Sequence, residues 1–246
     1  MIDREFPVGG SPSVKIGTRS GRVRVEAGEP GVVRMLVDTR DPSFEVTQRG
    51  DAILASGERG GRADVTVYAP PMIDIEVATA SADVSVVAPV GRLEVASASG
   101  DVVFDTALRL QMKSASGAVR GNGVDGEARC VTASGDIRIG TVGERADLST
   151  ASGDITIGRC QGSLSVATLS GDIQVGRHTG PDLNAKSMSG RVRIGIPPRT
   201  RLDLDANTLS GKVSLPSPSQ SPEPPEREMS VKVRLVSGNL TIERVD

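Results

Sequence analysis

A short motif of the form Ser-Gly-Asp-[Val/Ile] recurs along the chain at almost constant spacing. Four close copies begin at Ser99, Ser134, Ser152 and Ser170, and looser copies begin at Ser20, Ser81, Ser116, Ser189, Ser210 and Ser237. Between Ala82 and Gly190, the second residue of the motif returns after 18, 17, 18, 18, 18 and 19 residues. A period of this length is typical of repeat architectures, in which each unit packs on its sequence neighbours.

Aligning the copies on the motif glycine shows which positions face the core. Residues seven and five positions before it, and two and four positions after it, are mostly apolar. The column at seven before contains Leu93, Leu110, Ala128, Ala146, Leu164, Leu183, Leu204 and Val231, and the column at two after contains Val102, Val119, Ile137, Ile155, Ile173, Val192, Val213 and Leu240. A period of two on each side of the glycine predicts β-strands.

One unit is therefore a strand, a Ser-Gly corner, a second strand and a variable return. Antiparallel hairpins could also be built from 18-residue units, but identical inward columns favour stacking in parallel register. We expect an all-β fold: a single-chain parallel β-solenoid, or β-helix, of about 18-residue coils. Its core is narrow, because only Phe6, Phe44, Phe104 and Tyr68 are aromatic among 246 residues.

The two ends of the chain depart from the regular array. Residues 14–25 already match one coil. Residues 26–70 contain four strand-like runs that we interpret as an antiparallel elaboration, or as very long coils, capping the N-terminal end. The predicted domains are thus residues 1–70 and 71–246. A Pro/Ser-rich stretch begins at Pro216, and we interpret residues 216–230 as an insertion within the last coil.

The repeat resembles a known family. Serial Thr-x-Ser-Gly-Asp-[Ile/Val]-x-[Ile/Val] units, as in Thr150–Ile157, and the preceding element Val65–Pro70 are similar to the bacterial β-strand-repeat domain of unknown function that carries the label "putative adhesin" and is related to the toast-rack domains. This resemblance implies a single-chain β-helix, often found in proteins of envelope-stress signalling. It implies no catalytic residues.

Charge and composition limit the kinds of partner and the location that we expect. Twenty-nine basic and 31 acidic residues give a net charge of -2, which disfavours nucleic acid. The N-terminal stretch lacks the pattern of a secretory signal, and no apolar run is long enough for a membrane span, so we expect a cytoplasmic chain without membrane insertion. The thiols of Cys130, in an inward column, and Cys160, in a return loop that could be reachable, are expected to be reduced.

An acidic column follows the motif glycine. It contains Asp136, Asp154 and Asp172 on three consecutive coils, with Asp83 and Asp101 earlier, and it ends in Arg191 and Lys212, which could pair with Asp172. Stacked carboxylates can bind a hard cation. The alternative is that each Asp caps its own corner through backbone N–H groups and points into water.

Catalysis has few candidate residues. A glycan-cleaving β-helix would use clustered carboxylates, but the chain has no Trp, and its one His, His178, falls in a return that we expect to be exposed. A hydroxyl column, Ser97, Ser114, Thr132, Thr150, Thr168, Ser187 and Thr208, has inward parity and is expected to bond to backbone. We predict no catalytic residues and no cofactor.

The sequence favours a non-enzymatic binding or scaffolding module that mediates protein–protein contacts. A glycan-active or cation-binding β-helix that uses Asp136, Asp154 and Asp172 remains the alternative. Unpaired strand edges at the end coils could support self-association. Charges in the C-terminal segment, Lys232, Arg234, Glu243 and Arg244, argue against an open polymer, so we expect a monomer or a modest homo-oligomer.

Overall fold

The protein is all-β in a computed structural model that describes residues 1–57, 61–216 and 224–245. These residues contain no helix, and therefore no helix long and apolar enough to cross a membrane. The chain forms two compact units, residues 1–124 and 125–246. The boundary predicted at residue 70 is a different division, because it separates a cap from the repeat array. It stays a prediction from the sequence.

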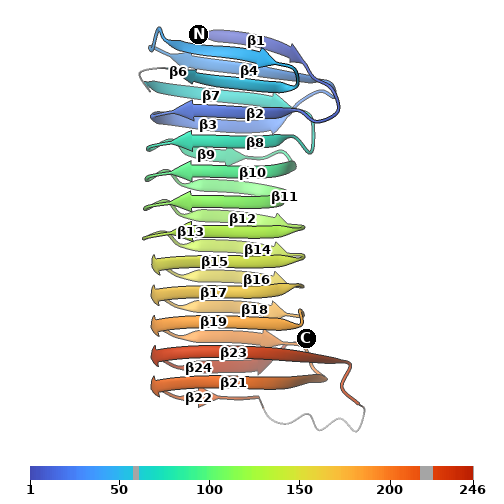
Figure 1. Cartoon of the computed structure of the whole chain (residues 1–246), viewed down its shortest axis with the longest axis vertical. Helices are drawn as coiled ribbons and strands as arrows, with labels where there is room; N and C mark the ends of the chain where they lie inside the picture. The colour runs from blue at the N-terminus through green and yellow to red at the C-terminus, as the bar shows by residue number, and fades with distance from the viewer. Residues whose placement is uncertain (58–60, 217–223, 246) are drawn as a thin grey trace. The chain divides into compact units, whose positions relative to one another are not determined.

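Unit 1 is built from twelve described strands (Figure 1). They are β1 (Ile2–Pro7), β2 (Ser13–Thr18), β3 (Ser20–Ala27), β4 (Val32–Thr39), β5 (Phe44–Arg49), β6 (Ala52–Gly57), β7 (Arg62–Ala69), β8 (Asp74–Thr79), β9 (Asp83–Val86), β10 (Val90–Ser97), β11 (Val102–Ser114) and β12 (Val119–Val124). Strand β11 is long enough to serve both walls of the solenoid, because its first part pairs with β9 and β12 and its last part pairs with β10.

The predicted first coil is present, and it lies inside the stack. Strands β2 and β3 pair in parallel with β8 and β9 on one side, and with β6 and β7 on the other. Both interpretations of residues 26–70 hold in part. Strand β4 pairs antiparallel with β1 and β7, and β5 with β6, whereas β6 and β7 form a parallel coil on β2 and β3. Strand β1 was not expected from the sequence pattern.

Unit 2 is built in the same way. Its strands are β13 (Glu127–Thr132), β14 (Ile137–Val142), β15 (Arg145–Ser152), β16 (Ile155–Cys160), β17 (Ser163–Ser170), β18 (Ile173–His178), β19 (Asp182–Ser189), β20 (Val192–Ile196), β21 (Thr200–Ser210), β22 (Val213–Ser214), β23 (Arg227–Ser237) and β24 (Leu240–Arg244). The predicted columns are in register: Ile155 pairs with Ile173, and Leu164 with Leu183. The parallel β-solenoid predicted from the repeat is confirmed.

The last two coils of unit 2 are not stacked in sequence order. Strand β23 pairs with β19 on one side and with β21 on the other, and β24 likewise lies between β20 and β22. The segment after the Pro/Ser-rich stretch therefore inserts into the stack, and β21–β22 becomes the end coil (Figure 1). Most of that stretch, residues 217–223, lies outside the described residues.

The corner glycines are required chiefly by close backbone contact. A Cβ on Gly153 would lie 2.4 Å from the carbonyl oxygen of Gly135 on the preceding coil, and one on Gly171 would lie 2.0 Å from that of Gly153. Only some corners, such as Gly171 with φ +156°, also have a positive φ. Positive φ, which glycine adopts without a Cβ clash, is therefore a secondary reason for glycine at these corners.

Candidate functional site

The carboxylates of the acidic column bond to the backbone of the next coil. In unit 2, Asp136 Oδ1 accepts a hydrogen bond from the N–H of Asp154 at 3.0 Å, and Asp154 Oδ1 accepts one from Asp172 at 2.9 Å. Asp172 accepts the N–H of Arg191 at 2.8 Å and forms an ion pair with its guanidinium at 2.9 Å. The capping interpretation was wrong in one respect: each Asp ties its coil to the following one, and does not cap its own corner.

The same bond occurs in unit 1, where Asp83 accepts the N–H of Asp101 at 3.1 Å. The predicted pairing of Lys212 with Asp172 does not form, because β24 intervenes and the Lys212 N–H donates to Asn239 Oδ1 at 2.9 Å. No group of three or more His, Cys, Asp or Glu side chains that could hold a metal ion occurs among the described residues. Cation binding by Asp136, Asp154 and Asp172 stays a prediction.

The inward hydroxyls are mostly bonded to backbone, as expected. Ser114 Oγ accepts the N–H of Gly117 at 2.8 Å, and Thr150 Oγ1 donates to the carbonyl of Gly135 at 3.2 Å. Ser187 is the exception, because its buried Oγ has no hydrogen-bond partner. Four residues of the column, Thr132, Thr150, Thr168 and Ser187, are buried, and Ser97, Ser114 and Thr208 are half-buried. The bonded hydroxyls stabilise the corners.

His178 is fully buried, which corrects the prediction of an exposed loop residue. It is the last residue of β18 and pairs in register with Cys160 of β16. Its Nε2 lies 3.1 Å from the backbone oxygen of Asp182, and its Nδ1 has no partner. Burial lowers the pKa of His178 to about 4, so the ring is neutral at pH 7.

Cys160 is also buried, so the prediction that it could be reachable was wrong. Burial raises the pKa of its thiol to about 11, and that of Cys130 to about 12. A protonated thiol beside a neutral imidazole inside the core cannot attack a substrate in solvent. A signal for this placement exists in the sequence, since seven positions after the motif glycine stand Ala107, Val124, Val142, Cys160 and His178, a third inward column.

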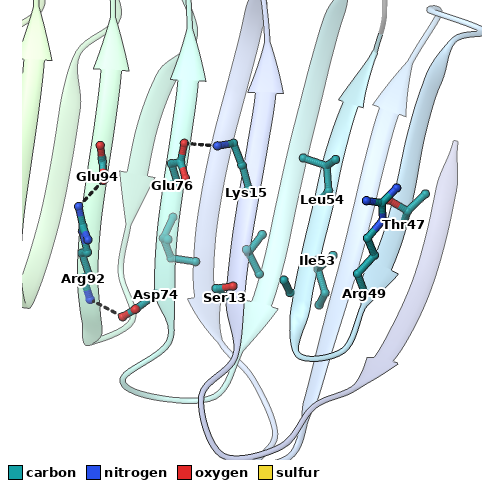
Figure 2. Close-up of a pocket in the computed structure, with 13 residues that line it drawn as sticks. Ser13, Lys15, Thr47, Arg49, Ile53, Leu54, Asp74, Glu76, Arg92 and Glu94 are labelled. Carbon is teal, nitrogen blue, oxygen red and sulfur yellow. Dashed lines mark hydrogen bonds and ion pairs between the residues drawn. The ribbon is translucent and has the colours of Figure 1, made fainter.

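A surface groove in unit 1 is a candidate binding site. Figure 2 shows it on the outer face of the wall formed by β5, β6, β2, β8 and β10, where it encloses about 330 Å³. The strand register explains the hollow. Along one row across the wall, the small side chains of Ala52 and Ser13 stand between Arg49 and Asp74.

The neighbouring row forms one side of the groove. Here Thr47, Leu54, Lys15 and Glu76 are lateral neighbours on β5, β6, β2 and β8. Lys15 and Glu76 form an ion pair at 2.5 Å, and Leu54 is 42% exposed between Thr47 and that pair (Figure 2). The groove therefore has an apolar side chain next to a neutralised pair of charges.

The two ends of the groove differ in charge. At one end, Asp74 accepts the N–H of Arg92 at 2.9 Å, and Arg92 forms an ion pair with Glu94 at 2.6 Å. At the other end, Arg49 has no hydrogen bond or ion pair within the described residues. One end can thus offer an unpaired guanidinium to a ligand.

Comparison with known families identifies the fold. The model of the family described as Toastrack DUF4097 matches residues 65–243, most of the chain. The chain belongs to this toast-rack family. None of the curated proteins matches it. The family resemblance predicted from the repeat is confirmed.

Two solved structures are similar to this chain over nearly their full length. One, a "putative lipid binding protein" from Parabacteroides distasonis, is 15% identical with a TM-score of 0.55, and the match covers 100% of this chain and 96% of that one. Another, a "putative adhesin" from Parabacteroides merdae, is 14% identical with a TM-score of 0.51 and the same coverage. At 14–15% identity, this similarity shows a shared fold and nothing about a shared role.

Proposed function

We propose that this toast-rack chain is a non-enzymatic binding module that holds a segment of a partner protein in the groove of unit 1. The observation that carries the proposal is the groove itself, with the half-exposed Leu54 beside it and the unpaired Arg49 at one end. Burial of an apolar anchor beside a charge-assisted hydrogen bond is a common basis of protein recognition.

The lining indicates the chemistry of the segment. A carboxylate can accept two parallel hydrogen bonds from the Arg49 guanidinium. An apolar side chain of the same segment can cover Leu54, and small side chains at Ala52 and Ser13 leave room for its backbone. A volume of about 330 Å³ holds two or three side chains, so the groove fits an acidic–apolar segment.

Relatives support binding in general and leave the partner open. The two structural neighbours bear names for adhesion and for lipid binding, and neither name describes a reaction. Contact with a protein partner, a role in envelope-stress signalling and a cytoplasmic location are the further parts of this proposal. Cell fractionation with an antibody to the chain tests the location directly.

A variant pair tests the groove. The tagged full chain is expressed in its own cells, and its bound proteins are compared with those of Arg49→Ser/Leu54→Asp. The matched control is Arg129→Ser/Val131→Asp on the outward face of β13, because Val131 is 43% exposed and Leu54 is 42% exposed. We expect a partner that the wild type and the control retain and the groove variant loses. Identical partners for all three chains would refute the groove.

A separate assay tests the glycan-active alternative. The purified chain is incubated with a panel of polysaccharides, and new reducing ends are measured. Turnover that disappears in Asp136→Asn/Asp154→Asn/Asp172→Asn would contradict a non-enzymatic module and support the acidic column as a site. We expect no turnover by either chain.

A further inference from the structure

The end coil of unit 2 leaves a long strand edge unpaired. Strand β21 has eleven residues and pairs with β23 on one side, and no other described strand pairs with it. Its inward residues Leu202, Leu204 and Ala206 are only half-buried, whereas their partners on β23 are fully buried. The core columns thus end at β21 without a cover.

Exposed apolar side chains gather toward the same end. Leu169, Met188, Val236 and Leu209 occupy one position on the four adjacent strands β17, β19, β23 and β21, and all four are exposed. Leu209, on the end strand, is 80% exposed, and Val213 and Leu215 of the same coil are exposed as well. Such a concentration marks an interaction surface.

Strand β21 also lacks a common protection of sheet edges. Proteins often place an inward-pointing charge on an edge strand, so that a second strand cannot add to it. The inward positions of β21 hold Thr200, Leu202, Leu204, Ala206 and Thr208, and none is charged. Its charges, Arg201, Asp203 and Asp205, all lie on the outward face, where they leave the edge open.

We propose that β21 pairs antiparallel with β21 of a second copy, about a two-fold axis at Asp205, to form an end-to-end dimer. This register uses all eleven residues, because Thr200 then lies opposite Ser210 and Leu204 lies opposite Ala206. The apolar columns of both copies meet across the axis. Pairing of identical edges is closed, so the dimer leaves no β21 edge for further growth.

The outward charges are compatible with this register. Asp203 comes to lie opposite Asn207, and Arg201 lies opposite Leu209. The two Asp205 side chains meet at the axis, but each already forms an ion pair with Arg234 at 2.5 Å, which holds the pKa of Asp205 below its ordinary value. Across the axis the charges then run in the order Arg234, Asp205, Asp205 and Arg234, so each carboxylate is neutralised by the arginine of its own copy.

The end of the coil is large enough for a stable dimer. Eleven residues at about 3.3 Å each give a strand of about 36 Å. Two walls about 10 Å apart, with their outward side chains, give an end about 20 Å wide. The second wall of this coil is described only over residues 211–216, about half the length of β21, so the contact is about 550 Å² on each copy. The total of about 1,100 Å² exceeds the roughly 1,000 Å² expected of a specific interface.

Light scattering and one cysteine variant test the proposal. The full chain should elute with twice the chain mass of 25.5 kDa at high concentration. Asp205→Cys should form a disulfide-linked dimer on mild oxidation, because residues opposite each other at the axis lie about 5 Å apart between Cα atoms. Asp203→Cys is the control, since its two copies lie about 14 Å apart in this register.

A charge variant gives a second readout. Leu209→Arg places an arginine opposite Arg201 at two symmetric positions, so the dimer should dissociate at least tenfold more readily. Leu169→Arg makes the same change on β17, three coils from the end coil, and should leave the dimer intact. A monomer at all concentrations, a chain of more than two copies, or cross-linking of Asp203→Cys in place of Asp205→Cys would each overturn the proposal.

Discussion

Acidification should destabilise unit 2 through His178. The ring is buried and neutral, and its pKa is lowered from 6.5 to about 4 by burial, against the smaller opposing effects of Asp182. At pH 5 about 97% of unfolded chains carry a protonated imidazole, whereas about a tenth of folded chains do. The unfolded state therefore gains protons, and the fold loses about 2 kcal/mol between pH 8 and pH 5.

The direction follows from the lowered pKa. The stabilisation is complete above the unfolded pKa of 6.5 and is lost as the pH falls toward about 4. Cys160, the neighbour of His178 on β16, stays protonated throughout this range because its pKa is raised to about 11. His178 is the only histidine of the chain, so its titration can be followed without interference.

The assay is urea denaturation at pH 8 and pH 5, with His178→Gln as the control. Glutamine can still donate to the carbonyl of Asp182 but does not titrate, so its free energy of unfolding should change little between the two pH values. Proton NMR of the single imidazole should show no titration near pH 6.5 in the folded chain. Equal stability of the wild type at both pH values, or a ring that titrates near 6.5, would refute the reasoning.

Three further predictions concern packing, the acidic column and the thiols. Gly121→Ala should cost about 1–3 kcal/mol, because its Cβ would lie 2.0 Å from Cζ of Phe104, and Phe104→Val in the same chain should restore part of the loss; thermal denaturation measures both. Asp154→Ala should cost about 1 kcal/mol by removing the acceptor of the Asp172 N–H, whereas Asp154→Asn keeps an acceptor and should cost less in urea denaturation. Cys130 and Cys160 should resist a thiol reagent at pH 8 in the folded chain and react in denaturant, since burial raises both pKa values; rapid labelling of the folded chain would contradict this.

The register of the strands could be predicted because every copy of the repeat has the same alternation of inward and outward side chains. Each motif glycine sets the inward positions on both sides, so Leu164 and Leu183, or Ile155 and Ile173, fall opposite each other without further information. His178 was misplaced because a polar residue in a return loop usually faces water. Val142 and Cys160 stand at the same offset from the motif glycine and are buried, and this column indicates the burial of His178 better than its residue type does.

The groove could not be predicted from the repeat. Its residues come from β5, β6, β2, β8 and β10, and their neighbours depend on the order in which the N-terminal strands stack. Arg49 and Ala52 belong to one hairpin, but Ser13 lies beside Ala52 only because β2 pairs with β6. A pattern within one coil contains no information about such lateral contacts between distant segments.

The same regularity that makes register predictable makes coil order ambiguous. Leu183 of β19 pairs with Val231 of β23, and Leu204 of β21 pairs with the same valine, so either strand has the pattern needed to lie next to β19. The later segment takes the inner position, where its inward side chains Met229, Val231, Val233 and Leu235 are fully buried. Strand β21 has Leu202, Leu204, Ala206 and Thr208 at these positions. These side chains are together smaller and more polar, so leaving them partly exposed at the open end costs less free energy. Burial of the more apolar strand therefore accounts for the inverted order, and it leaves at the end of unit 2 the strand whose edge is free to pair.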